Sequence, residues 1–578
     1  MSVITVENLR YRYPHAKELA LDGLDFSVEK GEFIGIIGEN GAGKSTLSQA
    51  LMGLVPQFYK GAYGGTVMVD GIEAGRTPVA QLCGHVGLVF QNPFNQLSGA
   101  KDNVYEEVAF GMQNLGVPAE EMKNRVEEAL KLLDIWQYRD RNPFDLSGGQ
   151  MQRVAIASVL VMRPDVMILD EPTSQLDPEG SDEVFKAVET LTGSGITILM
   201  IEQKIEKLAA YCDRILLLHK GKQIAFDTPQ KVFSMPDLNN YGIQAPAFTR
   251  ICKAEGVTLA DGTYPVTVEE AAGVLREKRL GAPACADGGE RAQKVTGTEL
   301  AQAGGPAESA GSSDEQFCIE NLDFSYLADV PVLKNLNMKL DKRPTAIIGQ
   351  NGAGKTTLVK LLKGLLKPVS GSIYFHGEDI SGKTVAMLAG NVGYVFQNPD
   401  DQIFKYNVMD EILFGPLNIG MDAERAKKEA ERALKLTGLT GKEKENPYDL
   451  ELYERKMTAI ASVLAMDTDV LILDEPTIAQ DWKGRQIIGG IIRSLSERGK
   501  LVIAILHDMD FVAENFERVI IMAHGRVLAD GTAKEVFAQE EALKKARLQK
   551  PYVMQLCEAL GYEKSYLTVE ELLKDQVS

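Results

Sequence analysis

Two stretches of this sequence have the residue types and spacing needed to hold a chain of phosphates. Gly38–Ser45 reads GENGAGKS and Gly349–Thr356 reads GQNGAGKT, and both match the P-loop pattern G-x-x-x-x-G-K-[ST]. In such a loop the backbone N–H groups point at the phosphates, the lysine adds a positive charge, and the final hydroxyl binds Mg²⁺. We therefore expect two nucleotide sites. Their candidate ligands are Gly38, Asn40, Gly41, Gly43, Lys44, Ser45 and Thr46 in the first copy and Gly349, Asn351, Gly352, Gly354, Lys355, Thr356 and Thr357 in the second.

Each P-loop is followed, further along the chain, by an apolar run that ends in two acids. Val166–Glu171 reads VMILDE and Val470–Glu475 reads VLILDE. A short apolar run of this kind predicts a buried strand, so the acids come to the strand's end. Asp170 and Asp474 suit Mg²⁺ coordination, and the glutamates that follow them can orient or deprotonate an attacking water. The two P-loops favour these roles over simple capping of the strands.

A third segment is present in only one of the two copies. Leu146–Gln150 reads LSGGQ and precedes the helical run 151–162, so its glycines and the helix N-terminus could approach a phosphate closely. The aligned segment Leu450–Glu454 reads LELYE. Glu451 adds a negative charge and two larger residues replace the glycines, which disfavours close approach of the backbone to an anion. The sequence therefore predicts two sites of unequal power.

The elements that must position these residues also occur twice. Lys44 and Lys355 lie 311 residues apart, and Asp170 and Asp474 lie 304 apart, which indicates a duplicated unit of about 300 residues. Each unit begins with β-rich sequence and continues with alternating strands and helices. We predict an α/β fold with two tandem P-loop NTPase domains. Each has a mainly parallel sheet, an antiparallel β subdomain, a helical subdomain and a small helical C-terminal extension.

The expected domain boundaries follow from this repeat. The first nucleotide-binding domain covers residues 1–240 and its extension 241–280, and the second covers 316–545 with its extension 546–578. Residues 281–315 between them are rich in Ala, Gly and Ser and nearly free of large apolar side chains. Such a segment cannot bury enough surface to offset its ordering entropy, so we predict a flexible tether.

Composition narrows the classes of function. The net charge of −19 argues against nucleic acid as the main partner, because nucleic-acid binding usually needs a basic surface. We find no signal-peptide pattern and no apolar run near the ~18 residues of a membrane span. The six cysteines include no C-x-x-C pair, as expected for free thiols in a reducing cytosol rather than for a metal site.

The order of P-loop, LSGGQ and apolar strand ending in Asp-Glu resembles the ABC-type ATPases over nearly the whole chain. In that family two cassettes meet head to tail, and each ATP lies between the P-loop of one and the LSGGQ of the other. The resemblance implies ATP and Mg²⁺ as ligands, and Q-loop glutamines that sense Mg²⁺ and contact a transmembrane partner. The implied additional ATP contacts are Gln91, Ser147, Gly148, Gly149, Gln150 and Gln397, with adenine stacking on Tyr13 and Tyr326 and D-loop aspartates at Asp177 and Asp481. Tyr11 and Phe324 lie close by and are alternatives for the stacking role. The implied Mg²⁺ ligands are Ser45, Gln91, Asp170, Thr356, Gln397 and Asp474.

The two copies also differ at the position of the family's switch histidine. His507 lies 33 residues after Asp474, where it would hydrogen-bond the γ-phosphate, but Gln203 lies 33 residues after Asp170. An amide can donate a hydrogen bond but lacks the proton chemistry of imidazole. Head-to-tail pairing puts Gln203 and the altered signature in one site. We therefore predict that the second-half site, with Glu475 and His507 as catalytic residues, hydrolyses ATP. The first-half site mainly binds it, although Glu171 leaves slow hydrolysis there open.

The segments after Gln91 and Gln397 look like those of energy-coupling-factor (ECF) ATPases, which receive coupling helices of a transmembrane T component. This resemblance implies an importer for a vitamin or metal ion, with a separate S component that binds the substrate. It places the chain on the cytoplasmic membrane face, held there by its partners. A conventional ABC transporter ATPase is the nearest alternative. A soluble ABC protein acting on ribosomes is less favoured, because it would be expected to have a long charged linker and two intact signatures.

Overall fold

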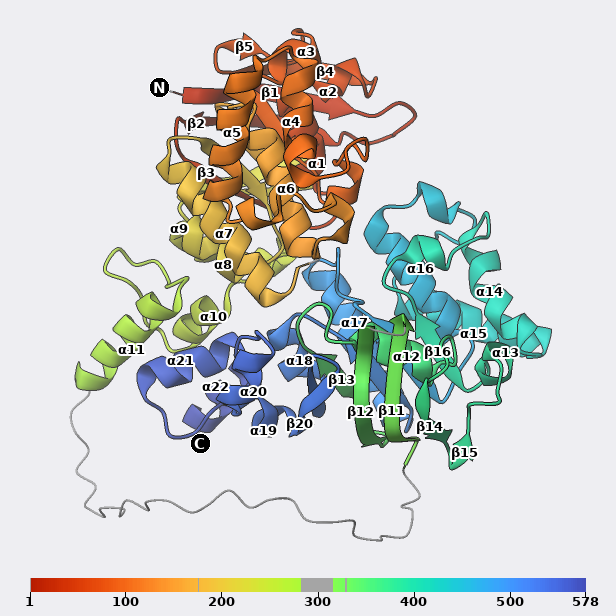
Figure 1. The fold of residues 1–578 in the computed structure, drawn as a ribbon. Coiled ribbons are helices and arrows are strands. Elements are labelled where there is room, and N and C mark those ends of the chain that lie inside the picture. The colour runs from red at the N-terminus through yellow and green to blue at the C-terminus, as the bar shows by residue number, and fades with distance from the viewer. Residues whose placement is uncertain (1, 175, 282–314, 328–329, 578) are drawn as a thin grey trace.

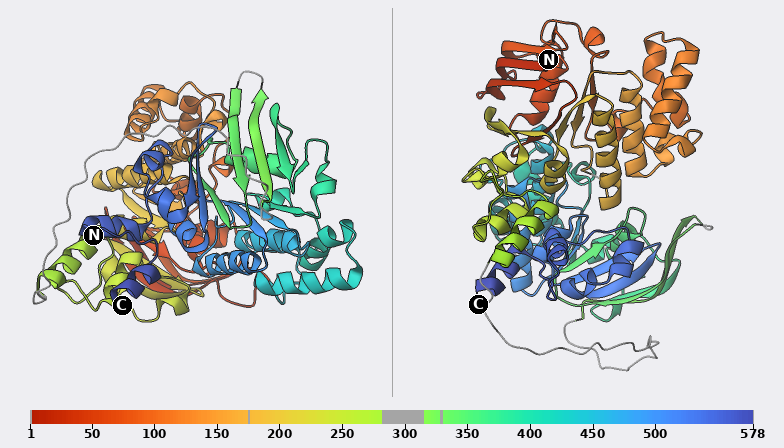
Figure 2. Two further views of the ribbon diagram at one scale, coloured as in Figure 1. Left: turned by 90° about the horizontal axis from the view of Figure 1, so that it is seen from below. Right: turned by 90° about the vertical axis from the view of Figure 1, so that its left-hand side faces the viewer.

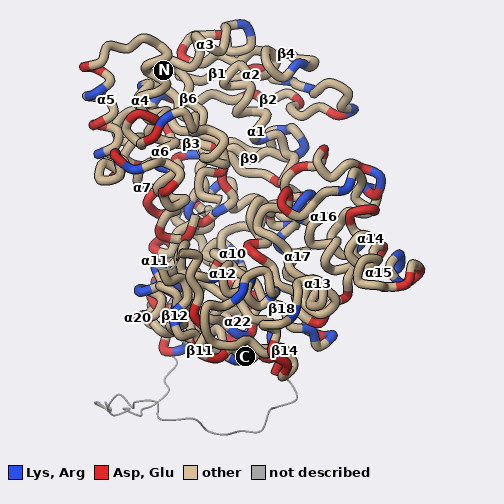
Figure 3. Tube along the Cα trace, turned by 45° about the vertical axis from the view of Figure 1, so that its right-hand side comes forward, with Lys and Arg blue, Asp and Glu red and all other residues tan. Residues whose placement is uncertain are grey.

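The computed structural model describes residues 2–174, 176–281, 315–327 and 330–577, and its two halves repeat one architecture (Figure 1). Most of the expected tether at 281–315 lies outside the described residues. Within the described ranges, no helix is long and apolar enough to cross a membrane. Lys/Arg and Asp/Glu positions are interspersed along the trace (Figure 3).

Each half contains a six-stranded, mainly parallel sheet with the P-loop strand inside it. In both sheets one edge strand is antiparallel to its neighbour. The first sheet has the order β10 (Lys222–Asp227), β9 (Arg214–His219), β3 (Phe33–Ile37), β8 (Thr197–Ile201), β7 (Val166–Asp170) and β6 (Val86–Val89). The second has the order β16 (Val392–Val395), β17 (Val470–Asp474), β18 (Leu501–Ile505), β13 (Thr345–Ile348), β19 (Arg518–Ala523) and β20 (Arg526–Thr532). In each sheet a single strand separates the P-loop strand from the strand that ends in the two acids. These strands are parallel, so their carboxyl ends lie at the same edge of the sheet.

An antiparallel sheet of four strands lies beside each main sheet. The first has the order β2 (Leu21–Glu29), β1 (Ser2–Arg12), β4 (Ala62–Val69) and β5 (Ile72–Glu73). The second has the order β12 (Val330–Leu340), β11 (Phe317–Leu327), β14 (Ser370–Phe375) and β15 (Glu378–Asp379). Alternate residues of β3 serve two cores. Ile34 and Ile36 pack with the antiparallel sheet and the P-loop helix, whereas Phe33 and Ile37 pack with the helical subdomain.

Helices cover both faces of each main sheet. In the first half they are α1 (Lys44–Leu51), α2 (Leu54–Gln57), α3 (Val79–Leu82), α4 (Val104–Asn114), α5 (Ala119–Leu132), α6 (Gly148–Leu160), α7 (Pro178–Gly193), α8 (Ile205–Tyr211) and α9 (Pro229–Phe233). In the second half they are α12 (Lys355–Leu362), α13 (Val385–Leu388), α14 (Val408–Asn418), α15 (Ala423–Leu436), α16 (Leu452–Leu464), α17 (Trp482–Glu497), α18 (Met509–Asn515), α19 (Ala533–Phe537) and α20 (Glu540–Lys545). Helices α4–α6 and α14–α16 form the helical subdomains. This arrangement confirms the predicted α/β fold with two tandem P-loop domains.

The last helices of the two halves pack against each other. These are α10 (Ala247–Ala254) and α11 (Val268–Gly281) from the first half and α21 (Tyr552–Leu560) and α22 (Val569–Val577) from the second. They share one apolar core, in which Phe248 meets Tyr552 edge to face at 5.7 Å. Figures 1 and 2 show α10 and α11 lying against the blue C-terminal helices. The two halves are therefore joined by a folded interface as well as by the chain.

Candidate nucleotide-binding sites

The two P-loops have nearly the same backbone and lysine geometry. Each follows a buried strand, and its first glycine has a positive φ with no room for a side chain. A Cβ on Gly38 would lie 2.4 Å from the Leu218 carbonyl oxygen, and one on Gly349 would lie 2.1 Å from that of Met522. The phosphate-binding lysines curl back onto their loops. Lys355 Nζ donates to the carbonyl oxygen of Gly349 at 2.7 Å, and Lys44 Nζ donates to that of Gly38 at 2.9 Å.

Two of the three predicted Mg²⁺ ligands of each half are hydrogen-bonded to each other, whereas the third, Gln91 or Gln397, donates to the neighbouring glutamate. Thr356 Oγ1 donates to Asp474 Oδ1 at 3.4 Å, and Tyr394 donates its hydroxyl proton to Asp474 Oδ2 at 2.8 Å. In the first half, Ser45 hydrogen-bonds Asp170, which partly offsets the rise in the pKa of Asp170 caused by its burial. Hydroxyl and carboxylate oxygens are the donors that Mg²⁺ prefers, so the residues present fit this ion.

Glu475 is held by three cationic or donor groups from its own half. His507 Nε2 lies 3.0 Å from Glu475 Oε1, and Gln397 Nε2 donates to Glu475 Oε2 at 2.8 Å. Lys456 Nζ donates to the Glu475 carbonyl oxygen at 2.6 Å. Burial alone would raise the pKa of this carboxyl, but the charges of His507, Lys355 and Lys456 outweigh it and lower the pKa to about 2. The carboxylate is therefore ionised at neutral pH.

Glu171 has the same backbone position but a different environment. Its two carboxylate oxygens accept hydrogen bonds from Gln91 Nε2 and Gln203 Nε2, both at 2.7 Å. Burial raises the pKa of Glu171 to about 7, and the charges of Asp170 and Glu202 add to this against the opposing charge of Lys44. Two carboxyls with the same sequence motif are thus driven about five pKa units apart by their neighbours.

The two halves meet head to tail across both P-loops. Asp177 is the N-cap of α7 and its Oδ2 accepts a hydrogen bond from Asn351 N at 3.2 Å, while Asp481 is the N-cap of α17 and its Oδ2 accepts one from Asn40 N at 2.9 Å. Each D-loop aspartate thus caps its own helix and contacts the P-loop of the other half. The pairing that the family resemblance implied is present within this single chain.

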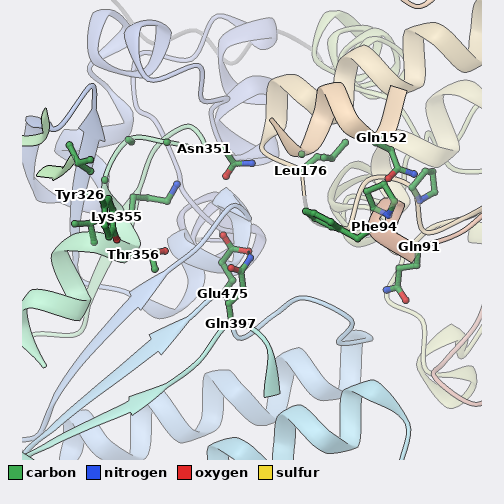
Figure 4. A pocket seen from close by; sticks show the side chains of 18 residues that line it. Gln91, Phe94, Gln152, Leu176, Tyr326, Asn351, Lys355, Thr356, Gln397 and Glu475 are labelled. Carbon is green, nitrogen blue, oxygen red and sulfur yellow. Dashed lines mark hydrogen bonds between the residues drawn. The ribbon is translucent and has the colours of Figure 1, made fainter. Parts of the chain in front are cut away.

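A cavity of about 500 Å³ lies between the second P-loop and the first half. Figure 4 shows Tyr326, Lys355, Thr356 and Glu475 on one side, and Gln152 and Leu176 of the first half on the other. Gly148 of the LSGGQ segment also lines it. Ser147 caps α6, and Gln150 Oε1 accepts a hydrogen bond from Ser147 N at 3.2 Å. The intact signature and the second P-loop therefore enclose one cavity.

The aligned second-half segment faces the first P-loop. Glu451 is the N-cap of α16, and its side chain lies over the loop, since a Cβ on Gly41 would have Glu451 Oε1 as its nearest neighbour at 3.8 Å. Glu39 of the same loop forms an ion pair with Lys483 of the second half at 2.7 Å. Gln203, Glu171 and the altered signature are thus assembled around one P-loop, as the head-to-tail prediction required.

The four aromatic residues considered for adenine stacking differ in how far they are buried. Tyr13 OH lies 3.1 Å from Thr46 Oγ1, and Tyr326 OH lies 3.3 Å from Thr357 Oγ1, so both rings stand beside their P-loop helices. The alternatives Tyr11 and Phe324 are 0% and 6% exposed. They pack edge to face under Tyr13 and Tyr326 with ring centroids 4.9 Å apart in each pair. Only the outer ring of each pair has a face for a base.

Sequence reasoning missed Lys456 and Tyr394. Both contact acids at the end of β17, yet neither belongs to a motif. The one available signal was the alignment of Lys456 with Gln152, six residues after Leu450 and Leu146 respectively. At this position the first half has a neutral side chain and the second half a charged one, and this difference close to Glu475 is visible in the sequence.

Comparison with known proteins settles the family. A family model described as "ABC transporter" matches residues 21–174 and 333–478. The chain belongs to the ABC transporter family. It is 38% identical over 99% of its length to a "Putative ABC transporter ATP-binding protein" of Caldanaerobacter subterraneus subsp. tengcongensis, covering 98% of that protein. It is 36% identical over 99% of its length to a protein of the same name from Methanosarcina acetivorans, covering 92% of it.

Two solved structures are also similar to this ABC protein. One is cbiO1 from Clostridium perfringens, described as part of the ABC transporter complex cbiONQ, with 36% identity, 43% of this chain and 100% of that chain covered, and a TM-score of 0.37. The other is the archaeal ribosome recycling factor aABCE1, solved in complex with the ribosomal stalk protein aP1. It has 20% identity, 91% and 90% coverage and a TM-score of 0.56, and so shares the fold.

Proposed function

We propose that this protein is the ATP-hydrolysing subunit of an ECF-type importer for a vitamin or metal ion, and that its second-half site is the main motor. The observation that carries the proposal is the Q-loop of the second half. Its glutamine, Gln397, bonds the ionised Glu475, and the chain then leads within a few residues to an exposed aromatic patch. A partner on that patch would be linked directly to the catalytic carboxylate.

Both halves have such a patch beside the Q-loop. In the first half, Phe94 is 54% exposed and stacks on Phe144 with centroids 6.0 Å apart. In the second half, Phe404 is 50% exposed and meets Phe414 edge to face at 4.5 Å, with Lys405 Nζ over the Phe414 ring. Exposed aromatic clusters rimmed by charge are typical of protein contact surfaces. The pair fits a membrane partner with two coupling helices.

The second-half site supplies the parts needed for ATP hydrolysis. Lys355 and the loop N–H groups would hold the phosphates, while the signature of the first half closes over them. Thr356 and Asp474 would hold Mg²⁺, which neutralises charge on the phosphates. Glu475 would orient and deprotonate the attacking water, and His507 would fix both the carboxylate and the γ-phosphate.

The first-half site lacks two of these parts. Gln203 replaces the histidine, and the facing signature has a carboxylate in place of a serine hydroxyl. Glu171, with a pKa near 7, is only partly ionised at neutral pH. We therefore assign this site to nucleotide binding and to holding the two halves together, with at most slow turnover.

The test is to purify the tagged chain from detergent-solubilised membranes of its own host and identify what comes with it. We expect a small polytopic membrane protein in a fixed ratio, and its recovery should fall in Phe144→Asp and Phe404→Asp; Phe144 is chosen over Phe94 because Phe94 also lines the nucleotide cavity. Val369→Asp is the matched control, because Val369 is 69% exposed next to β14 on the antiparallel sheet, away from both patches. Recovery of ribosomal subunits, or of ordinary permeases without a T-type protein, would refute the ECF assignment.

A further inference from the structure

The two signature helices both present their N-termini to the nucleotide sites, but the residues at those N-termini differ in charge. Helix α6 is capped by Ser147, which forms a capping box with Gln150; both are neutral and leave the positive helix end available to an anion. Helix α16 is capped by Glu451, whose N–H donates to Glu454 Oε2 at 3.3 Å, and Glu454 also forms an ion pair with Lys442. The Glu451 carboxylate therefore already compensates the positive end of α16 and weakens its attraction for a further anion.

The Glu451 carboxylate also lies directly above the first P-loop. Its Oε1 would be 3.8 Å from a Cβ on Gly41, whereas a Cβ on the equivalent Gly352 would meet nothing within 4 Å. Burial and the neighbouring Glu454 raise the pKa of Glu451, and the positive charges of Lys44 and Lys442 oppose this rise. Glu451 in turn raises the pKa of Tyr13, although burial is the larger cause there. One P-loop is thus covered by a negative charge, and its counterpart opens into a cavity.

Phosphates bound at a P-loop extend from the loop toward the facing signature. The last phosphate of a triphosphate held by Lys44 would come beside Glu451, and like charges a few ångströms apart repel strongly in a protein cleft. A diphosphate ends one group earlier and keeps the contact with the loop. We propose that the first-half site selects a nucleoside diphosphate over the triphosphate, and that Glu451 sets this selection.

This inference rests on the head-to-tail use of the two sites in the proposed function. It gives the weak site a definite occupant, since a bound diphosphate would keep the first-half interface filled while the second-half site turns over. The D-loop contact between Asp481 and Asn40 involves no phosphate, so it can persist with either nucleotide.

The chain offers a local reporter for the test. It has two tryptophans, Trp136 and Trp482. Trp482 is the first residue of α17 and follows Asp481, which contacts the first P-loop. A Trp136→Phe chain therefore has one tryptophan beside this site. Adding Lys355→Ala removes the phosphate lysine of the second-half site, so that the titration reads the first-half site.

We would titrate this chain with ATP and with ADP at constant Mg²⁺, and repeat both with radiolabelled nucleotide by equilibrium dialysis in case the fluorescence is silent. ADP should bind about tenfold or more tightly than ATP. Glu451→Gln keeps the shape of the side chain and removes its charge. It should raise ATP affinity by about tenfold while changing ADP affinity by less than about threefold, and Glu451→Ser should do the same.

Equal or tighter binding of ATP in the parent chain would overturn the proposal. A preference for ADP that survives in Glu451→Gln would also overturn it, because the charge would then not be the cause. Thermal unfolding of each variant checks that it is folded. Hydrolysis at the second-half site is measured separately, by comparing the rates of the parent chain and of Glu475→Gln with Lys355 intact. A wrong assignment of the hydrolytic site therefore appears in the rates, whereas a wrong assignment of diphosphate selection appears in the binding affinities.

Discussion

Replacing Glu475 by glutamine should abolish nearly all ATP hydrolysis, whereas the same change at Glu171 should leave the steady-state rate almost intact. The two residues occupy the same place in the motif and both accept a hydrogen bond from a Q-loop glutamine. They differ in charge state, because His507 and Lys456 hold the pKa of Glu475 at about 2, whereas burial raises that of Glu171 to about 7.

The expected size of the effect follows from the role proposed for Glu475, since half protonation of Glu171 would by itself change a rate only about twofold. At pH 7 Glu475 is fully ionised and Glu171 is about half protonated. A positioned general base contributes roughly 10²–10⁴-fold to a rate, or about 3–5 kcal/mol of barrier. If the second-half site performs nearly all turnover, Glu475→Gln should lower kcat about a hundredfold or more, and Glu171→Gln should change it less than about twofold.

The assay is steady-state phosphate release at saturating MgATP and pH 7. Equilibrium ATP binding is the control, since glutamine keeps the shape of the side chain and the Glu475→Gln chain should still bind ATP. Turnover that persists in Glu475→Gln but vanishes in Glu171→Gln would refute the assignment of the motor site. A loss of half the rate in each variant would refute the asymmetry itself.

Three further outcomes are expected. Because the pKa of Glu171 is raised to about 7, its neutral form stabilises the fold below pH ~4.5 and that stability is lost as the pH rises through 7. Glu171→Gln should therefore raise the unfolding free energy by up to about 3 kcal/mol above pH 7 and by nothing below pH ~4.5, measured by denaturant unfolding across pH. Lys456→Gln removes a charge that lowers the pKa of Glu475, so the acid limb of the pH–rate profile should move to higher pH and kcat should fall. Gln203→His alone should have little effect. Combined with restoration of Leu450–Glu454 to LSGGQ, it should give a second active site, so that Glu475→Gln no longer abolishes hydrolysis.

Much of the fold could be predicted because its signals are local. The apolar run before each acid pair predicts the buried strands β7 and β17, and the helical periodicity after each P-loop predicts α1 and α12. The helix boundary is less accurate. Periodicity does not give the first and last residues of α1 (Lys44–Leu51), which depend on glycine conformation: Gly43 at φ 99° lets the helix begin at the next residue, and Gly53 at φ 68° follows its end.

The difference between the two glutamates could be predicted only in part. The exchange of His507 for Gln203 is visible at a fixed spacing, but the contact of Lys456 with the Glu475 carbonyl oxygen depends on how α16 packs against β17. The shared core of α10 and α21 is likewise a contact between segments about 300 residues apart. Side-chain neighbours of this kind come from packing, and no spacing in one sequence specifies them.

Helix α16 contributes residues to both nucleotide sites, so its sequence affects more than the loss of the LSGGQ motif. Its N-cap, Glu451, covers the first P-loop, and five residues later Lys456 donates a hydrogen bond to the carbonyl oxygen of Glu475 in the other site. The equivalent residue in α6 is Gln152, a neutral amide that lines the second-half cavity. The changes along α16 thus weaken the attraction of its N-terminus for a terminal phosphate in the first-half site and add a positive charge beside Glu475 in the second. Decay of an unused cassette would explain the first change but not the second. Together they favour a helix whose sequence fits both a binding site and a motor.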